Sequence, residues 1–332
     1  MAGSPALLRA MLYHRIEDPS SPHPELEPDL ITATPAAFRR QLRHLARGYH
    51  PVAAGELVAA LAGQHRLPPR AVLITFDDGY RDFKEVAWPI LRELRLPAVL
   101  FVTTGFVDQP RRIFWWDALW QMLTRTGRRW VDLPEDGGRP VPLQAADVIG
   151  GFRTIAAWLK ERTPAERRAA MDYLAEHLGV VPEPTEAVLS WSDLRELARS
   201  GVAIAAHTQS HELLDQVDPP ILQAEIEGSR DDIVRELGSG TPLFAYPNGN
   251  FNRAAMEAVE AAGFAAAFTT VHGASDLRRA NPFALRRDDG GTSLLRFAVK
   301  LLGPVTAYRN RRHALPAYAQ ARGQGRSSVV GR

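Results

Sequence analysis

Short clusters of polar side chains stand directly after apolar runs of the chain. They are Asp77-Asp78-Gly79, His207-Thr208-Gln209-Ser210-His211, Tyr246-Pro247-Asn248-Gly249 and the weaker Arg286-Arg287-Asp288-Asp289. In parallel α/β folds, catalytic groups collect at the carboxyl ends of the strands, which meet at one edge of the sheet. The clusters therefore predict a single shared cleft.

Two histidines in the second cluster have the spacing of metal ligands. His207 and His211 are four residues apart, which puts both imidazoles on one face of a helical turn. A carboxylate from the first cluster would complete a His₂Asp set, and three protein ligands with an open fourth position are typical of catalytic zinc. An isolated HxxxH is more often a pair of surface histidines, but the Asp-Asp pair in the same chain favours a metal site.

The adjacent aspartates indicate a division of labour. Side chains of neighbouring residues in an extended chain point in different directions. One carboxylate can therefore bind a metal ion while the other acts as general base on a water, as metal-assisted hydrolysis requires. The structural alternative is a turn in which Asp77 or Asp78 caps the following helix.

The composition describes a globular protein and excludes several classes. The chain has 332 residues, of which 45% are hydrophobic and 23% charged. Its net charge of +2 gives no general reason to expect a nucleic-acid partner, and the absence of cysteine excludes disulfides and thiolate metal sites. Neither a signal-peptide pattern nor an apolar run of ~20 residues is found, so we predict a cytoplasmic protein.

Strand-like apolar runs alternate with helical patterns, which predicts parallel βα units. The expected strands are 6–13, 71–76, 98–102, 202–206, 243–246 and 264–268. The expected helices are 35–48, 56–61, 83–94 (bent or split at Pro89), 191–200, 220–237 and 253–262. Residues 108–190 break this rhythm with helical patterns at 116–125, 145–161 and 164–178 and a loop at 134–142, which we interpret as a helical insertion.

TFDDGY (75–80), HTQSH (207–211) and FAYPNG (244–249), in this order, resemble the first three motifs of the polysaccharide deacetylase family. This is the NodB-homology fold of carbohydrate esterase family 4. The resemblance covers about residues 6–300 and implies a distorted (β/α)7 barrel with the 108–190 insertion. One catalytic domain is expected over 1–303, followed by a basic, flexible tail over 304–332 that has six Arg and no acidic residue.

The resemblance also implies a chemistry and its residues. Asp78, His207 and His211 would hold a divalent metal, most often Zn2+, with Co2+, Ni2+ or Mn2+ as alternatives. Asp77 would be the general base, and the backbone N–H of Asn248 would stabilise the oxyanion, a contact worth ~3–4 kcal/mol elsewhere. The implied reaction removes N-acetyl groups from sugars of a polysaccharide or a lipid-linked glycan.

The sequence departs from the family pattern in two places. The third motif usually has an arginine that orients the catalytic aspartate, and here Ala245 takes its place. Arg286 or Arg287 is the expected replacement because a guanidinium fork suits a carboxylate, and Arg286 is our choice for the site. The late general-acid histidine of the family has no clear match after residue 290. His14, at the end of the first strand, is preferred over His272 and His313 as the cleft histidine.

Three tryptophans lie near the start of the insertion. Trp116 and Trp120 share a helical face and are expected to pack in a core, which leaves Trp115 to stack on a sugar ring.

The same residues are also compatible with other functions. The same fold hosts deformylases, O-acetyl esterases and hydrolases of cyclic ureides, and substrate choice lies in loops. A carbohydrate-binding protein that has lost its chemistry is a further alternative, and an iron(II) oxygenase triad is a weaker one. Membrane contact through the basic tail is less favoured than a solvated tail. The oligomeric state is left open.

Overall fold

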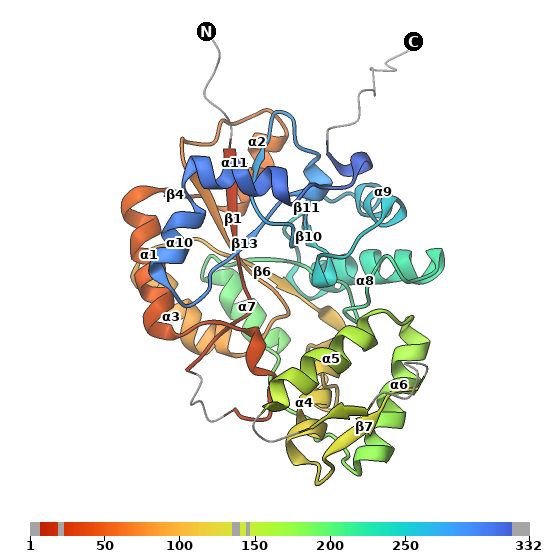
Figure 1. Ribbon diagram of the computed structural model, residues 1–332. Helices are drawn as coiled ribbons and strands as arrows, with labels where there is room; N and C mark the ends of the chain where they lie inside the picture. Colours follow the sequence, from red (N-terminus) through yellow and green to blue (C-terminus); the bar gives the residue numbers. More distant parts are fainter. Residues whose placement is uncertain (1–6, 19–22, 135–139, 144–146, 321–332) are drawn as a thin grey trace, which may run out of the picture.

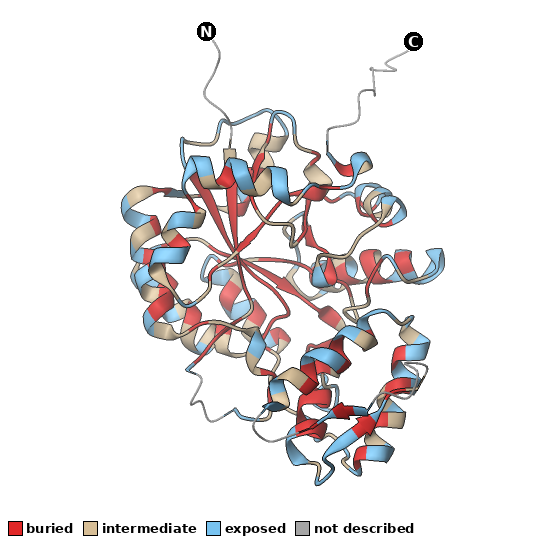
Figure 2. Cartoon of the chain, in the orientation of Figure 1, coloured by how far each residue is buried: buried red, intermediate tan, exposed pale blue. Residues whose placement is uncertain are grey.

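The computed structural model describes residues 7–18, 23–134, 140–143 and 147–320 (Figure 1). Its centre is a sheet in which parallel strands follow the order β11-β10-β9-β6-β5-β1, with β12 antiparallel at the edge beside β1. These strands are β1 (Leu7–Tyr13), β5 (Ala71–Phe76), β6 (Val99–Val102), β9 (Ala203–Ala206), β10 (Leu243–Ala245), β11 (Ala266–Phe268) and β12 (Ala274–Asp276). Their residues are mostly buried on both faces, as Figure 2 shows, which explains why the sequence reads as continuous apolar runs.

The segment 285–289 curls the sheet towards a barrel. Leu285 pairs in parallel with Phe268 of β11, and β13 (Asp288–Asp289) pairs in parallel with β1. The chain between residues 285 and 289 thus links the last strand of the sheet to the first. This confirms the predicted distorted (β/α) barrel.

Helices surround the sheet, and local sequence signals explain where several of them begin. They are α1 (Pro35–Gly48), α2 (Ala54–Leu61), α3 (Trp88–Glu93), α7 (Trp191–Arg199), α8 (Pro219–Leu237), α9 (Arg253–Ala261), α10 (Leu294–Lys300) and α11 (Gly303–Arg312). The Thr34 hydroxyl accepts the N–H of Ala37 at the start of α1, and Pro35 stands at the first helical position. The predicted interruption near Pro89 is confirmed, because π-helical turns (η2, Phe83–Ala87) precede α3.

Shorter elements complete the framework. They are β2 (Arg15–Ile16), β3 (Ile31–Ala33), β4 (His50–Pro51) and the 3-10 turns η1 (Pro28–Leu30), η3 (Thr104–Phe106), η5 (Pro247–Gly249), η6 (Pro282–Ala284) and η7 (Ala317–Ala319). β2 pairs with β3 outside the main sheet, and β4 extends the pairing at the start of β5.

The insertion is built on a hydrophobic cluster that it shares with Leu26, Tyr80 and Phe106 of the barrel. The helices α4 (Trp115–Arg125), α5 (Val148–Lys160) and α6 (Pro164–Leu178) pack around Leu119, Ile155, Leu159 and Leu174, all fully buried. Part of the predicted loop is wrong: β7 (Trp130–Asp132) and β8 (Pro140–Pro142) form an antiparallel pair. Each strand contributes only one buried valine between two exposed residues, too short a pattern for periodicity to reveal.

The predicted flexible tail is also wrong as far as residue 320. α11 and η7 continue the fold, and the remainder of the tail (321–332) lies outside the described residues. Arg309 forms an ion pair with Asp288 at 2.9 Å, and the Asn310 side chain bonds both the N–H and the C=O of Ala274. These contacts hold α11 against β12 and β13. No helix among the described residues has the length and apolarity needed to cross a membrane.

Candidate active site

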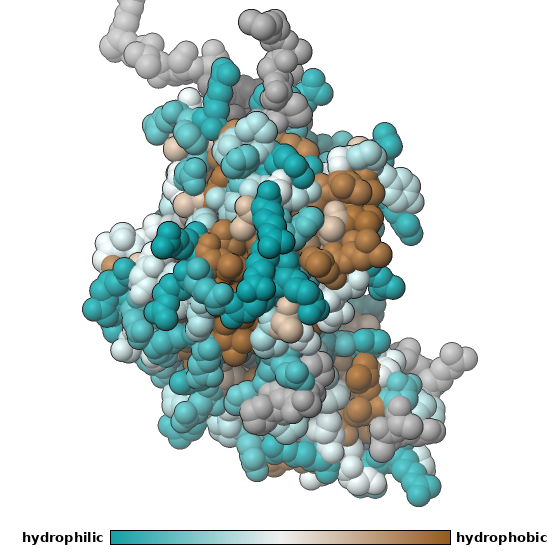
Figure 3. Space-filling model, turned by 90° about the vertical axis from the view of Figure 1, so that its left-hand side faces the viewer, coloured by the Kyte–Doolittle hydropathy of each residue, from teal (hydrophilic) through white to brown (hydrophobic). Residues whose placement is uncertain are grey.

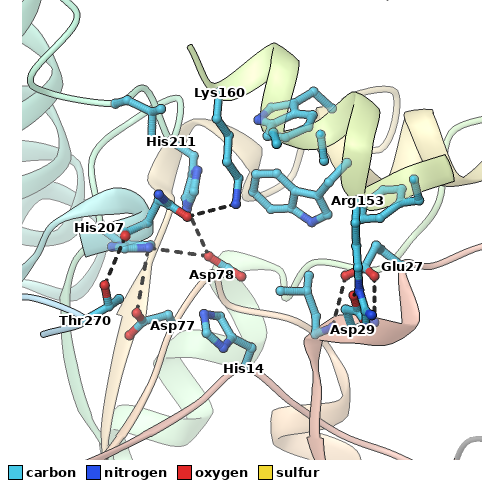
Figure 4. Close-up of a pocket in the computed structure, with 18 residues that line it drawn as sticks. His14, Glu27, Asp29, Asp77, Asp78, Arg153, Lys160, His207, His211 and Thr270 are labelled. Atoms are coloured by element: carbon cyan, nitrogen blue, oxygen red, sulfur yellow. Dashed lines mark hydrogen bonds and ion pairs between the residues drawn. The ribbon is translucent and has the colours of Figure 1, made fainter. Parts of the chain in front are cut away.

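The strand ends bring the sequence clusters to one pocket of about 320 Å³ (Figure 4). Asp77 and Asp78 follow β5, His207 follows β9, and Asn248 lies in η5 after β10. His14 lines the same pocket from the end of β1. The predicted convergence of the first three clusters on a single cleft is therefore seen in the structure.

Asp78, His207 and His211 form a group that fits a divalent metal ion. Oδ1 of Asp78 is 3.4 Å from Nε2 of His207 and 3.4 Å from Nε2 of His211, and the three ligand atoms lie within 4.8 Å of one another. This carboxylate oxygen is buried and makes no hydrogen bond within the described residues. Burying such an atom is costly unless a partner compensates, and a cation would do so. Two imidazole nitrogens and one carboxylate oxygen are a ligand set that zinc accepts.

The histidines meet by a different route from the one the sequence suggested. Residues 207–211 form a loop, so the predicted helical turn is wrong. Thr208 and His211 both have positive φ, at 65° and 57°, and these two left-handed residues turn the chain back on itself. Nδ1 of His207 lies 2.7 Å from the carbonyl oxygen of Ala245, to which it donates when Nε2 faces Asp78.

Neighbouring charges hold the two aspartates in their ionised forms. Burial alone would raise the pKa of Asp78, but the adjacent imidazoles of His207 and His211 outweigh it and hold that pKa well below its usual value. Burial opposes ionisation of Asp77 as well. There the Arg287 guanidinium, helped by His207, keeps the pKa lowered.

Arg287 and Asp77 form a buried, bidentate ion pair. Nη1 is 2.6 Å from Oδ1, and Nη2 is 2.6 Å from Oδ2. Nε of Arg287 donates to the carbonyl of Thr269 at 3.0 Å, so the fork itself is held in place. Asp77 is thereby oriented with Oδ2 at 4.0 Å from Nε2 of His207.

The choice of Arg286 is wrong. Its guanidinium donates to the carbonyl oxygens of His272 and His313, at 2.8 and 2.6 Å, and not to Asp77. Consecutive residues of an extended segment point to opposite sides, so only one of the two arginines can face the barrel interior. The register of 285–289 makes Arg287 that residue.

Asn248 joins the strand-end loop to the insertion. It has a left-handed backbone, with φ 55°, and its N–H donates to no other described group. Nζ of Lys160, at the end of α5, donates to Oδ1 of Asn248 at 3.0 Å. Thr270 bonds the Asn248 carbonyl at 3.1 Å. Sequence reasoning missed Lys160, whose position near the end of the expected 145–161 helix was its only signal.

Aromatic residues of the insertion form another part of the pocket wall. Trp115 and Trp116 both line the pocket. Trp116 and Trp120 are buried, as expected, but Trp116 also packs edge-on against His211, with ring centroids 4.7 Å apart. Nε1 of Trp116 donates to the hydroxyl of Tyr80 at 2.8 Å. The insertion therefore packs against His211 as well as lining the pocket.

The other histidines considered from the sequence lie in different surroundings. His272 is 3.5 Å from both Asp288 and Asp289, and its ring meets that of His313. Neither residue lines the pocket. His14 is the one of these histidines that faces Asp77 and Asp78 (Figure 4).

Glu27, which also lines the pocket, is expected to make the stability of the protein depend on pH. Burial raises its pKa to about 7, although its carboxylate accepts the N–H groups of Asp29 and Leu30. The folded state thus holds this proton more tightly than the unfolded state. Stability should fall as the pH rises from about 4.5 to about 7, by roughly 3 kcal/mol from this group.

Glu27→Gln removes this titration. We expect the free energy of unfolding of the variant, relative to the unaltered chain, to increase between about pH 5 and about pH 8. Denaturant titrations at several pH values measure it. Hydrogen bonds lost in the variant would change its free energy of unfolding by the same amount at every pH. A difference between variant and unaltered chain that does not vary with pH would therefore contradict the raised pKa of Glu27.

The fold is shared with known deacetylases. The Streptococcus pyogenes deacetylase PplD, solved in complex with acetate, has a TM-score of 0.57 and 19% identity, covering 86% of this chain and 93% of that one. IcaB from Ammonifex degensii has a TM-score of 0.55 and 20% identity, covering 91% of this chain and 97% of that one. At these identities the likeness concerns the fold.

The sequence identifies the family. The chain matches the family described as Polysaccharide deacetylase over residues 64–133 and 143–267, which make up more than half of its length. It belongs to the polysaccharide deacetylase family, as the motifs indicated. It is also 33% identical over 102 residues to the poly-beta-1,6-N-acetyl-D-glucosamine N-deacetylase of Escherichia coli (strain K12). That match takes in 30% of this chain and only 14% of the much longer relative.

Proposed function

We propose that this protein hydrolyses N-acetyl groups on the sugars of a polysaccharide or a lipid-linked glycan. The proposed cofactor is a divalent metal ion, with Zn2+ preferred over Co2+, Ni2+ or Mn2+. The observation that carries the proposal is the buried Asp78–His207–His211 group beside an aspartate held by an arginine fork. Membership of the family supports the same reaction class.

The metal site is assigned to Asp78, His207 and His211. A divalent ion bound there supplies Lewis acidity, which polarises the amide carbonyl and makes a water more acidic. His207 is positioned for this task by the Ala245 carbonyl, and His211 is positioned by the ring of Trp116. Such outer contacts fix the orientation of ligand side chains.

Asp77 acts as general base in this proposal. It removes a proton from the attacking water as the water oxygen bonds to the acyl carbon. The bond between that carbon and the sugar nitrogen then breaks, the nitrogen takes up a proton, and acetate and a free amine are the products. Arg287 leaves Asp77 ionised and correctly oriented for the first step.

Asn248 and His14 are assigned to the charges that develop during the reaction. The Asn248 N–H is available to the oxyanion because it donates to no other described group. His14 borders the same pocket and is the proposed proton donor to the leaving nitrogen. The insertion, through Trp115 and Lys160, is proposed to be part of one catalytic domain rather than a separate unit.

Acetate release from N-acetylglucosamine oligomers tests the proposal. Protein stripped with EDTA should release none, and adding Zn2+ should restore release. Equal release before and after stripping would contradict the metal site. Metal binding without release, measured with the same oligomers, would contradict the N-acetyl substrate. Formate release from an N-formyl sugar would then assign the site to a deformylase.

The arginine contact also bears on the alternative of a binding protein without catalysis. Ala245 suggested that the catalytic aspartate lacked its usual partner. Arg287 supplies a buried guanidinium to Asp77 from another segment, so the loss at Ala245 no longer argues for a lost activity.

A further inference from the structure

The helices α1, α10 and α11 form a surface with an unusual charge. α10 packs against both α1 and α11. The three helices contain no acidic residue and nine basic ones: Arg39, Arg40, Arg43, Arg47, Arg296, Lys300, Arg309, Arg311 and Arg312. In a chain whose net charge is only +2, this concentration of positive charge is local.

Most of these cations are not neutralised by a neighbour. Arg39 pairs with Glu93, Lys300 with Asp289 and Arg309 with Asp288. The others form no ion pair with any residue that the structure describes: Arg40, Arg43, Arg47, Arg296, Arg311 and Arg312. The surface therefore keeps a positive potential that is free to attract an anionic partner.

The same surface exposes large apolar side chains. Leu295 and Val299 of α10 are 74% and 40% exposed, Leu302 in the connection to α11 is 51% exposed, and Tyr308 of α11 is 54% exposed. Other described parts of the chain expose such residues more sparsely, for example Ile221 and Val234 of α8, thirteen positions apart. Figure 3 shows this side of the molecule, where apolar areas lie directly beside long hydrophilic side chains.

α10 and the two residues that follow it carry apolar side chains on the buried side and on the exposed side. Phe297 and Leu301 point inward and are fully buried against the barrel, while Leu295, Val299 and Leu302 face solvent. The exposed side also carries Arg296, so apolar and basic side chains stand together on this surface. Exposed apolar side chains among basic ones are typical of a surface that lies in a membrane interface.

We propose that α1, α10 and α11 form a docking surface for an anionic lipid membrane. Basic side chains would bind the lipid headgroups, and Leu295, Val299, Leu302 and Tyr308 would enter the boundary with the acyl chains. This combination favours a membrane over a soluble polyanion, because a polyanion would bind the arginines and leave the four apolar side chains in water. A second copy of the chain is not the expected partner, because two surfaces with the same positive charge repel each other. The sequence of residues 321–332 adds three Arg and no acid, so it offers no complementary charge either.

Vesicle binding by the purified full chain tests this proposal. The chain should bind vesicles of phosphatidylcholine mixed with phosphatidylglycerol, and should not bind phosphatidylcholine alone. Replacing one arginine in each helix (Arg43→Gln, Arg296→Gln, Arg311→Gln) should weaken binding about fivefold per charge, roughly a hundredfold together. The matched control removes three exposed arginines elsewhere: Arg66→Gln, Arg128→Gln and Arg129→Gln.

A second variant tests the exposed apolar side chains. Leu295→Ser, Val299→Ser and Leu302→Ser together should weaken vesicle binding by at least about tenfold. Ile221→Ser with Val234→Ser, on α8, is the control and should bind as the unaltered chain does. All these residues lie outside the catalytic pocket, so hydrolysis of a soluble substrate should be unchanged, and vesicle binding is read without reference to activity.

Three results would overturn the proposal. These are absence of binding to the anionic vesicles, equal binding by the arginine variant and its control, or full binding by the serine variant. The last result, with loss in the arginine variant, would assign the surface to a soluble polyanion instead.

Discussion

Asp77→Asn should lose about 10²–10⁴-fold in kcat and still bind the metal ion. The side chain keeps its shape, and its carbonyl oxygen can still accept a hydrogen bond from Arg287. The amide cannot take a proton from water, so only the base function is removed. Acetate release measures kcat, and the metal content after dialysis measures binding.

Asp78→Asn is the comparison that separates the two aspartates. Its oxygen faces both histidines, so this variant should lose metal affinity as well as turnover. Identical behaviour of the two variants would refute the division of roles between neighbouring residues. Full turnover by Asp77→Asn would remove Asp77 as the base.

The framework of the barrel could be predicted because each of its main signals is local. β5 is apolar apart from Thr75 and ends at Phe76, so the sequence alone places the Asp77 carboxylate at a strand end. The start of α1 is marked by Thr34 and Pro35 in the same way. The convergence of Asp78 and His207 then follows from parallel strand order, in which β5, β6 and β9 are neighbours.

Features that depend on register or on distant contacts could not be predicted. Whether Arg286 or Arg287 faces Asp77 depends on how 285–289 pairs with β1 and β11, and a shift of one residue reverses the answer. α11 is held by Asp288 and Ala274, which no local pattern in a basic segment reveals. Lys160 reaches Asn248 only because the insertion folds back over the strand ends.

Arg287→Met should destabilise the protein by about 3–5 kcal/mol and reduce turnover. Both side chains of the pair are almost completely buried, so removing the guanidinium leaves the Asp77 carboxylate without its main partner. In the Asp77→Asn background the same substitution should cost much less, because no buried charge remains. Denaturant unfolding of the two single variants and the double variant measures the coupling. Equal costs in both backgrounds would show that Arg287 stabilises the barrel independently of Asp77.

Moving the arginine from position 287 to position 245 tests whether Arg287 orients Asp77 as the usual third-motif arginine, replaced here by Ala245, would. Ala245 belongs to the same buried cluster as Phe101 and Phe268, the rings that flank the Arg287 guanidinium. Arg287→Ala vacates volume in that interior, and Ala245→Arg returns a guanidinium to it. We expect the double variant to recover part of the stability and kcat that Arg287→Ala loses. Recovery of stability without kcat would mean that the new fork neutralises Asp77 but does not orient it. Recovery of neither would show that the two positions do not serve the same carboxylate.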